Sequence, residues 1–338
     1  MSDETTGRLR HSDCSASGIT RRRRGRYWQY FDADGTRITD RDQIDRLNAI
    51  GLPPAYRDAW FCPNANGHIQ AIGYDEKGRK QYRYHVGFRA RRDQSKYLRT
   101  ADFGRALPKL RKRVEADLRK RSLGRDTIAA AIVRLMDNEY LRVGNEAYAQ
   151  ANKSFGATTL RARHAKLAGN KLRMRFKAKS GVERELDITD KRLIRVVRNC
   201  QDLPGQHLFQ YLDADGEPRP ITSSDVNDYI REATGEDFTA KHFRTWGASA
   251  IAFEAVCAAG EEGIGLKALL EPVAAALGNT PTMARKAYVH PALIEAVKRD
   301  GGRAVRGLTC PRGNKYLSSA ERGLIAFLDK APRKSRNG

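Results

Sequence analysis

The feature that most constrains the fold of this chain is a change of hydrophobic pattern near residue 90. Before it, short strand-like runs such as Tyr27–Phe31 are separated by turn residues, as at residues 32–35. Beyond it, apolar residues recur at helical spacing, as Ile128, Ile132 and Met136 do. We therefore expect an α+β protein with a small β-rich N-terminal domain and a larger, mostly helical domain.

The expected domains follow from this division, and 338 residues are enough for two separate cores. We expect a disordered basic arm over residues 1–26, a β-rich domain over 27–90, a helical domain over 91–330 and a basic tail over 331–338.

The first domain is expected to hold one helix and several strands. The helix is expected over residues 42–49, and the strands over residues 27–31, 36–39, 59–62, 68–74 and 79–85. In the second domain, helices are expected over residues 101–121, 126–140, 191–199, 224–233, 240–258, 266–277, 282–288, 291–299 and 318–328. A break is expected at Pro108. The runs 158–167, 171–176 and 182–188 predict a three-stranded antiparallel sheet among these helices.

The charge balance indicates a polyanionic partner. Lys and Arg total 63 against 40 Asp and Glu, a formal charge of +23, and an excess of this size points first to nucleic acid. No run approaches the roughly 18 apolar residues of a membrane span, and the N-terminus lacks the apolar core of a secretory signal. The five cysteines and seven histidines are scattered, so we expect a reducing cytoplasm and no bound metal.

Three basic positions in the second domain are suited to phosphate chemistry: Arg142, Lys179 and Arg244. Arg142 comes just before Gly144, at the end of an apolar helix, and Lys179 falls in the turn between two strands. Arg244 shares a helix face with Lys241. Arginine binds two phosphate oxygens through its planar fork, and lysine among other cations can donate a proton near neutral pH. Taken alone, Arg142 and Lys179 are more typical of solvated surface side chains, and Arg244 is compatible with a basic DNA-facing helix that has no chemical role.

Asn279 and Tyr288 complete the set of candidates. Asn279 stands between a helix that ends at Gly278 and one that begins with Thr280 and Pro281, so its amide is expected at a junction where it could donate to phosphate. Tyr288 offers a phenol for a reversible covalent step. The chain has 13 tyrosines, so only the joint pattern singles this one out.

In this joint pattern the chain resembles the type IB DNA topoisomerases, and most closely their small poxvirus-like bacterial branch. The resemblance spans about residues 25–330, and the order of its motifs is highly specific. The matching segments are Leu-Arg-Val-Gly-Asn at 141–145, Phe-Lys-Ala-Lys-Ser-Gly at 176–181, Lys-His-Phe-Arg-Thr-Trp-Gly at 241–247, Leu-Gly-Asn-Thr-Pro at 277–281, Lys-Ala-Tyr at 286–288 and the run from Gly73 to His85.

The resemblance implies a role for each candidate. Tyr288 would attack the scissile phosphate and form a 3′-phosphotyrosyl intermediate, Arg142 and Arg244 would clamp that phosphate, and Lys179 would protonate the leaving 5′-oxygen. Asn279 stands where many relatives have histidine. An amide can donate to a phosphoryl oxygen but does not titrate near neutral pH, so we expect no histidine-like ionisation from this position.

The resemblance also implies a DNA-contacting strand in the first domain. Gln81, Tyr82 and Tyr84 match positions that touch DNA, and Arg79 and Lys80 lie beside them. The alternative is that the two tyrosines, which share a strand face, belong to a β core. The two domains would close as a clamp around duplex DNA, and the region 91–330 would be the catalytic domain.

The implied activity is relaxation of supercoiled DNA by cleavage, strand rotation and religation, with no cofactor and no ATP; the chain has no Walker-type phosphate loop. We expect a cytoplasmic, nucleoid-associated monomer that binds double-stranded DNA, without a membrane or an obligate protein partner.

Two other functions stay open from the sequence. A site-specific tyrosine recombinase or integrase would use the same chemistry, but such enzymes usually carry His-x-x-Arg where this chain has Lys241 and Arg244, with His242 displaced by one position. The β-rich first domain also favours a topoisomerase, since recombinases tend to have a helical one. The second alternative is a non-catalytic basic DNA-binding protein, in which Tyr288 would have no chemical role.

Overall fold

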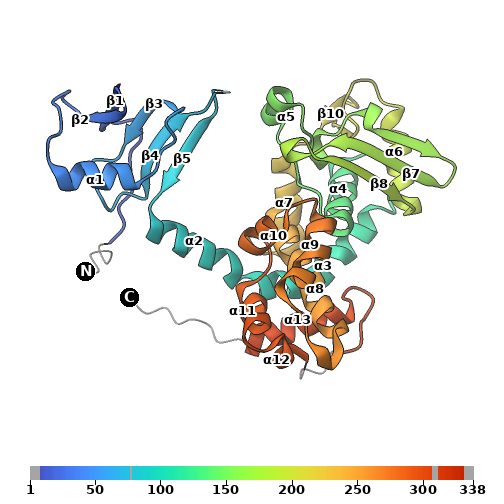
Figure 1. Ribbon diagram of the computed structural model, residues 1–338. Coiled ribbons are helices and arrows are strands. Elements are labelled where there is room, and N and C mark those ends of the chain that lie inside the picture. Colours follow the sequence, from blue (N-terminus) through green and yellow to red (C-terminus); the bar gives the residue numbers. More distant parts are fainter. Residues whose placement is uncertain (1–7, 77, 307–310, 331–338) are drawn as a thin grey trace. The chain divides into compact units, whose positions relative to one another are not determined.

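The computed structural model of this chain describes residues 8–76, 78–306 and 311–330 (Figure 1). Helices and several small antiparallel sheets make it up, so the predicted α+β class is confirmed. The first residues of the expected arm and the whole tail at 331–338 lie outside the described residues.

The chain divides into two compact units, Met1–Lys96 and Tyr97–Gly338, and each has a hydrophobic core. The first unit holds two antiparallel sheets, one of β1 and β2 and one in the order β3-β4-β5. Tyr30, Leu47 and Phe61 are buried in its core. Its elements are β1 (Thr20–Arg24), β2 (Tyr27–Phe31), α1 (Arg41–Ala49), β3 (Arg57–Phe61), β4 (Ile69–Tyr74), β5 (Lys80–Tyr84) and the start of α2 (Val86–Leu98).

Strand β1 corrects the expectation of a disordered arm over residues 1–26. Arg21 stacks its guanidinium 4.1 Å from the ring centroid of Trp28 and donates hydrogen bonds to the carbonyls of Leu52 and Pro53, at 2.8 and 2.6 Å. An arginine-rich run forms a strand here because the aromatic strand β2 offers rings and the loop after α1 offers acceptors.

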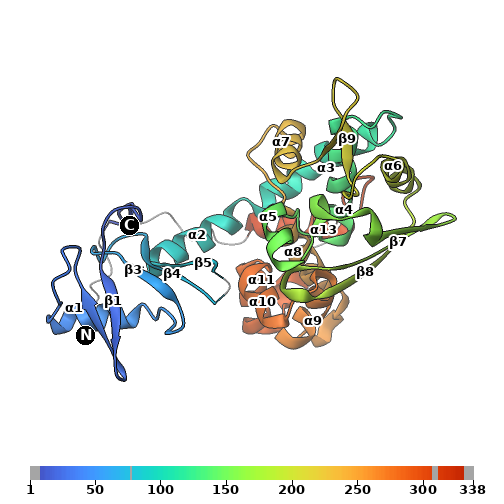
Figure 2. The same cartoon turned by 90° about the horizontal axis from the view of Figure 1, so that it is seen from above.

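The second unit is mostly helical. Its helices are α3 (Thr100–Asp117), α4 (Arg125–Glu139), α5 (Glu146–Asn152), α6 (Lys191–Gln201), α7 (Ser223–Thr234), α8 (Lys241–Ala258), α9 (Leu266–Leu277), α10 (Pro281–Ala287), α11 (Pro291–Asp300), α12 (Arg303–Arg306) and α13 (Ser319–Lys330). Its strands are β6 (Ala165–Ala168), β7 (Lys171–Lys177), β8 (Glu183–Ile188), β9 (Gln210–Leu212) and β10 (Pro218–Pro220). Helices α9 and α11 pack on α8, and α10 packs on α9 (Figures 1 and 2).

The predicted three-stranded antiparallel sheet is confirmed, in the order β6-β7-β8. Along β7, Leu172, Met174 and Phe176 are buried and the basic residues between them are exposed. This alternation places one face of the sheet on the core and leaves the other in solvent. The turn after β7 therefore projects from the edge of a well-packed element.

Other expected elements differ from the structure. The predicted strands at 36–39 and 158–161 are reduced to isolated bridges, Phe31 with Arg37 and Arg161 with His207. Pro108 does not break α3. An internal proline costs about 3 kcal/mol, but the flanking helix buries Leu107 and Leu110 against its neighbours, which holds it continuous. Helix α2 and the short strands β9 and β10 were not predicted.

Candidate active site

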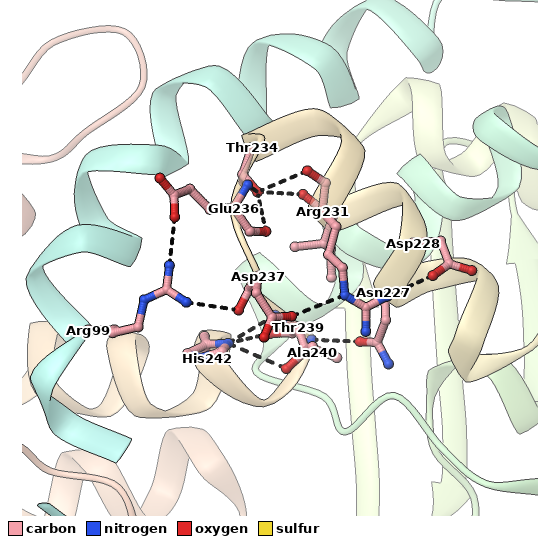
Figure 3. A network of polar contacts seen from close by, with 11 residues as sticks. Arg99, Asn227, Asp228, Arg231, Thr234, Glu236, Asp237, Thr239, Ala240 and His242 are labelled. Carbon is pink, nitrogen blue, oxygen red and sulfur yellow. Dashed lines mark hydrogen bonds and ion pairs between the residues drawn. The ribbon is translucent and has the colours of Figure 1, made fainter. Parts of the chain in front are cut away.

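Helix α8 begins at a hydrogen-bonded turn that fixes the direction of its first side chains (Figure 3). The Thr239 N–H donates to Nδ1 of His242 at 2.9 Å, and the Ala240 N–H donates to the side-chain oxygen of Asn227 at 3.0 Å. No side chain of the described residues caps this helix; the His242 imidazole accepts from the Thr239 N–H instead.

His242 is held in this structural role. Its ring lies against Phe103 and Phe238, and burial lowers its pKa to about 4. The imidazole therefore stays neutral near pH 7 and serves as an acceptor. This placement does not match a recombinase-type histidine acting beside Arg244.

Arg244 lies one turn into α8 and is only 5% exposed. Nη1 donates to the carbonyl of Tyr140, and Nη2 donates to the carbonyl of Leu277 at 3.1 Å. Burial lowers the pKa of Arg244 to about 10, with a further contribution from the charge of Arg142, so the guanidinium stays protonated at neutral pH. Two helix ends, those of α4 and α9, thus hold this cation in place by their carbonyls.

Arg142 lies in the loop after α4, as predicted. That helix stops at Tyr140, which has the left-handed φ of 53°, and the loop turns again at Gly144, with φ of 106°. The Arg142 carbonyl accepts from the Ala157 N–H at 2.8 Å, so the loop backbone is anchored. The side chain is thereby presented next to Tyr288.

Tyr288 contacts both arginines. Arg142 Nη2 donates to the phenolic oxygen at 2.9 Å, and the guanidinium carbon of Arg244 lies 4.8 Å from the centroid of the phenol ring. The half-buried Tyr288 follows α10 and its N–H donates to the Ala284 carbonyl at 3.0 Å, which fixes the backbone. A cation bonded to the phenolic oxygen favours the phenolate, the nucleophilic form.

Asn279 lies at the predicted junction between α9 and α10, with Thr280 capping α10 through a bond from Met283 N. The side-chain amide faces both arginines. In one orientation its oxygen accepts from Arg142 Nη2 at 3.4 Å; in the other its oxygen accepts from Arg244 Nη2 at 2.9 Å while its nitrogen donates to the Gly278 carbonyl at 3.2 Å. The second orientation is favoured because it gives both polar atoms of the amide a hydrogen-bond partner.

Lys179 is exposed in the turn between β7 and β8, as predicted. The next residue, Ser180, has a left-handed φ of 68°, and Ala178 N bonds to Val182 O at 2.7 Å to close the turn. In the part of the chain that the structure describes, Lys179 makes no hydrogen bond or ion pair with Arg142, Arg244 or the other candidates. The structure thus brings four of the five predicted catalytic residues into one cluster and leaves Lys179 at the tip of a hairpin.

Arg184 is a member of this cluster that sequence reasoning missed. It lies on β8 on the same face as the buried Leu186 and Ile188, and its Nη2 donates to the carbonyls of Glu139 and Ala276, both at 3.2 Å. Burial lowers the pKa of Arg184, and the charge of Arg142 lowers it further while that of Glu139 raises it. A charged residue in the core-facing register of a strand was the signal that could have found it.

The site therefore combines two guanidiniums and an amide around one phenol, and the third guanidinium, that of Arg184, lies on the helix ends beside them. Guanidiniums held close together repel one another, and an anionic ligand between them would relieve that repulsion. Hydrogen-bond donors fixed in advance around a nucleophile are what a phosphodiester transfer requires of a protein.

The predicted DNA-contacting residues lie on and beside β5. Tyr82 is 42% exposed, which argues against a core position, and its ring stacks on that of Tyr84 at 6.1 Å. Arg79 and Gln81 both bond to Asp75, at 2.7 and 3.0 Å. The hydrogen bond from Arg79 lowers the pKa of Asp75 to about 2.

Two further predicted DNA-contacting residues are exposed. Lys80 holds its ammonium 5.7 Å from the Tyr82 ring centroid, on β5. Lys241 lies at the first position of α8, on the second unit. Both side chains can reach phosphates without loss of a buried contact.

Neither a metal cluster nor a membrane-spanning helix is found in the described ranges. No group of three or more His, Cys, Asp or Glu side chains there is placed to hold a metal ion. No helix among those residues has the length and apolar character needed to cross a membrane.

Comparisons with known proteins show which family the chain belongs to. The family "Eukaryotic DNA topoisomerase I, catalytic core" matches residues 85–300, and the family "Bacterial DNA topoisomerase IB, N-terminal domain" matches residues 27–75. DNA topoisomerase 1B of Acanthamoeba polyphaga mimivirus is 34% identical over 243 residues, which cover 71% of this chain and 72% of that protein.

A solved structure of the XerH site-specific recombinase, bound to palindromic difH substrate in a post-cleavage complex, is 16% identical with a TM-score of 0.36. The match covers 56% of this chain and 50% of the recombinase chain, and a likeness this weak carries no argument. The family matches and the viral relative suffice: the chain belongs to the type IB DNA topoisomerases and is an enzyme of that class.

Proposed function

We propose that this DNA topoisomerase relaxes supercoiled duplex DNA by cutting and resealing one strand through Tyr288, without metal or ATP. The observation that carries the proposal is the contact of Arg142 Nη2 with the phenolic oxygen, 2.9 Å, beside the buried Arg244. A phenol in direct contact with one cation and stacked on a second is prepared for attack on a phosphate.

In the cleavage step the Tyr288 oxygen, having lost its proton to solvent water, forms a bond to the scissile phosphorus as the bond from phosphorus to the 5′-oxygen breaks. Lys179 delivers a proton to that 5′-oxygen, and the 3′ end stays attached to the protein as a phosphotyrosyl diester. Arg142, Arg244 and Asn279 donate to the non-bridging oxygens, where charge builds up.

Relaxation needs no further chemistry. The free 5′ end rotates about the intact strand under the torsional strain of the DNA, and the reverse reaction reseals the break. Because the phosphotyrosyl bond keeps the energy of the broken ester, no cofactor has to supply it.

We further propose that the domains 27–90 and 91–330 act as a monomeric clamp on the duplex, with Arg79, Lys80 and Lys241 contacting phosphates and Gln81, Tyr82 and Tyr84 facing the groove. Exposed basic residues on both units support this, since phosphate contacts dominate DNA affinity. We place the enzyme with the nucleoid in the cytoplasm, where its substrate is.

The test is relaxation of a supercoiled plasmid that carries no recombination site, with EDTA present and ATP absent. We expect the wild type to relax it, Tyr288→Phe to be inactive, and the matched control Tyr211→Phe, a half-buried tyrosine on β9, to be unchanged. Denaturation during turnover, followed by digestion, should locate nucleotide on Tyr288. Normal relaxation by Tyr288→Phe, or an adduct on another tyrosine, would overturn the proposal.

A further inference from the structure

Two arginines from different elements bridge the same two helix ends. Arg244, from α8, bonds to the carbonyls of Tyr140 and Leu277. Arg184, from β8, bonds to the carbonyls of the residues just before them, Glu139 and Ala276, at 3.2 Å each. Helix C-termini carry partial negative charge, so both cations are held where the helices α4 and α9 end. Arg142 and Asn279 follow directly after these ends.

Arg184 also packs on the residue before Asn279. Gly278 has a left-handed φ of 61°, and a Cβ at this position would come within 3.0 Å of Arg184 Nη1. The guanidinium of Arg184 thus occupies the space beside the α9–α10 junction. A shift of this side chain would therefore displace the backbone that carries Asn279.

The hairpin of β7 and β8 carries Lys179 at its tip, and Arg184 is paired with Phe176 across it. Of the hydrogen bonds found among the described residues, the two that join this hairpin to the ends of α4 and α9 both come from Arg184. The apolar side chains of the hairpin pack on the core, but apolar contacts do not specify position as hydrogen bonds to fixed carbonyls do.

We propose that Arg184 is a positioning residue that holds the Lys179 hairpin in register with the cluster of Arg142, Arg244 and Tyr288. The inference rests on the proposed function, because it assumes that Lys179 protonates the leaving 5′-oxygen. Arg184 itself acts through Lys179 and the helix ends, and it does not touch the reacting atoms. A misplacement of about 1 Å in a catalytic group can cost about a hundredfold in rate.

The test measures single-turnover cleavage of a duplex at a site that the wild type cuts. One version has the normal 5′-oxygen leaving group, and the other has sulfur in its place. A thiolate leaves without protonation because the pKa of a thiol is far below that of an alcohol. We expect Arg184→Ala to cleave the oxygen duplex about 10- to 100-fold more slowly than the wild type, by loss of positioning, and to cleave the sulfur duplex within about threefold of the wild-type rate.

Three variants frame the result. Lys179→Ala should show the same rescue by sulfur, and Arg142→Ala should show none, because it is placed to act on phosphate charge. Arg173→Ala, an exposed residue of the same hairpin paired with Asp187, should leave both rates unchanged. If Lys179→Ala is not rescued, the assigned role of Lys179 fails and the inference about Arg184 fails with it. Rescue of Lys179→Ala without rescue of Arg184→Ala overturns the inference about Arg184 alone.

Cleavage of the oxygen duplex by Arg184→Ala at the wild-type rate would overturn the inference. So would an equal loss on both duplexes, which would place Arg184 in the phosphate cluster itself. A urea unfolding curve and the duplex Kd check that the variant is folded and binds DNA. If Arg184→Ala does not fold, Arg184→Lys is used in its place. Its ammonium can still donate to both carbonyls, so we expect a smaller loss of cleavage rate on the oxygen duplex and the wild-type rate on the sulfur duplex. A loss of rate on both duplexes contradicts the inference.

Discussion

Glu321 on α13 allows the strongest quantitative test of how the second unit is held together. Its carboxylate is 9% exposed and accepts from Arg111 at 2.8 and 2.9 Å, from the Trp246 indole N–H at 2.9 Å and from the Ser318 N–H at 2.9 Å. The last of these, with the bond from Glu321 N to Ser318 Oγ, forms a capping box at the start of α13. Trp246 lies on α8 two residues beyond Arg244, so this network braces the helix that carries a candidate catalytic residue.

The expected loss of unfolding free energy in Glu321→Ala follows from the hydrogen-bond donors that the substitution leaves without an acceptor. The indole N–H of Trp246, buried and without an acceptor, costs about 1–3 kcal/mol. The two charge-assisted bonds of Arg111 are worth about 1.5–3 kcal/mol, but Arg111 keeps Asp137 at 2.7 and 2.8 Å, so no unpaired buried charge remains. These two contributions add up to about 2.5–6 kcal/mol, and we take the middle of this range, about 3–5 kcal/mol.

The assay is urea unfolding followed by fluorescence at pH 7. We expect Glu321→Ala to lower the free energy of unfolding by about 3–5 kcal/mol and Glu321→Gln, which keeps an acceptor, by about half as much. The exposed Glu232→Ala serves as the control and should change it by less than about 0.5 kcal/mol. A loss below about 1 kcal/mol in Glu321→Ala would refute the reasoning, because it would mean that the network is dispensable.

The same network has a pH signature. Burial alone would raise the pKa of Glu321, but the hydrogen bonds and the charge of Arg111 outweigh it and hold the pKa below its ordinary value. A carboxyl with a lowered folded-state pKa stabilises above its unfolded pKa, about 4.3, and loses that contribution as pH falls through the folded pKa. The difference in stability between the wild type and Glu321→Gln should therefore be constant above about pH 5.5 and shrink at lower pH.

Three further outcomes test other parts of the molecule. Gly247→Ala puts a Cβ 2.1 Å from Cε1 of Tyr140, and this overpacking should lower the free energy of unfolding in urea by about 1–3 kcal/mol. It should also slow cleavage, because it displaces Tyr140, whose carbonyl accepts from Arg244; an unchanged free energy of unfolding would contradict the packing. Asn279→Ala should slow single-turnover cleavage about tenfold or more without changing the shape of its pH profile between 6 and 8, and an untouched rate would remove Asn279 from the site. The double change Arg22→Ala with Arg24→Ala removes two exposed cations of β1 and should lower the slope of log Kd against log salt by about 1–2, whereas an unchanged slope would exclude β1 from the DNA contact.

Long periodic patterns were predictable from the sequence, and contacts between distant segments were not. Helices α4, α8 and α9 begin and end within one residue of the predicted bounds because each carries buried residues along most of its length. The turn around Lys179 and the junction at Asn279 were also predicted from local residues. Arg184 was missed because its partners, Glu139 and Ala276, are 45 and 92 residues away along the chain. Strand β1 was missed because an arginine run has low strand propensity, and the rings that stabilise it belong to β2.

The helix ends explain how cations can be gathered before any anion arrives. Arg184 and Arg244 would repel one another and Arg142 if their charges were left uncompensated. Each instead donates to carbonyls at the C-termini of α4 and α9, whose partial negative charge offsets part of the repulsion. Among the described residues Arg142 makes no bond to these carbonyls and contacts the phenol, so it is the guanidinium best placed to turn toward a bound phosphate. The positions of the two bridging arginines depend on where α4 and α9 end, because the carbonyls that they bind belong to the backbone and cannot be removed by mutation. Tyr140 and Gly278, both in left-handed conformation, set those helix ends. These two residues therefore control the site as much as the charged side chains do.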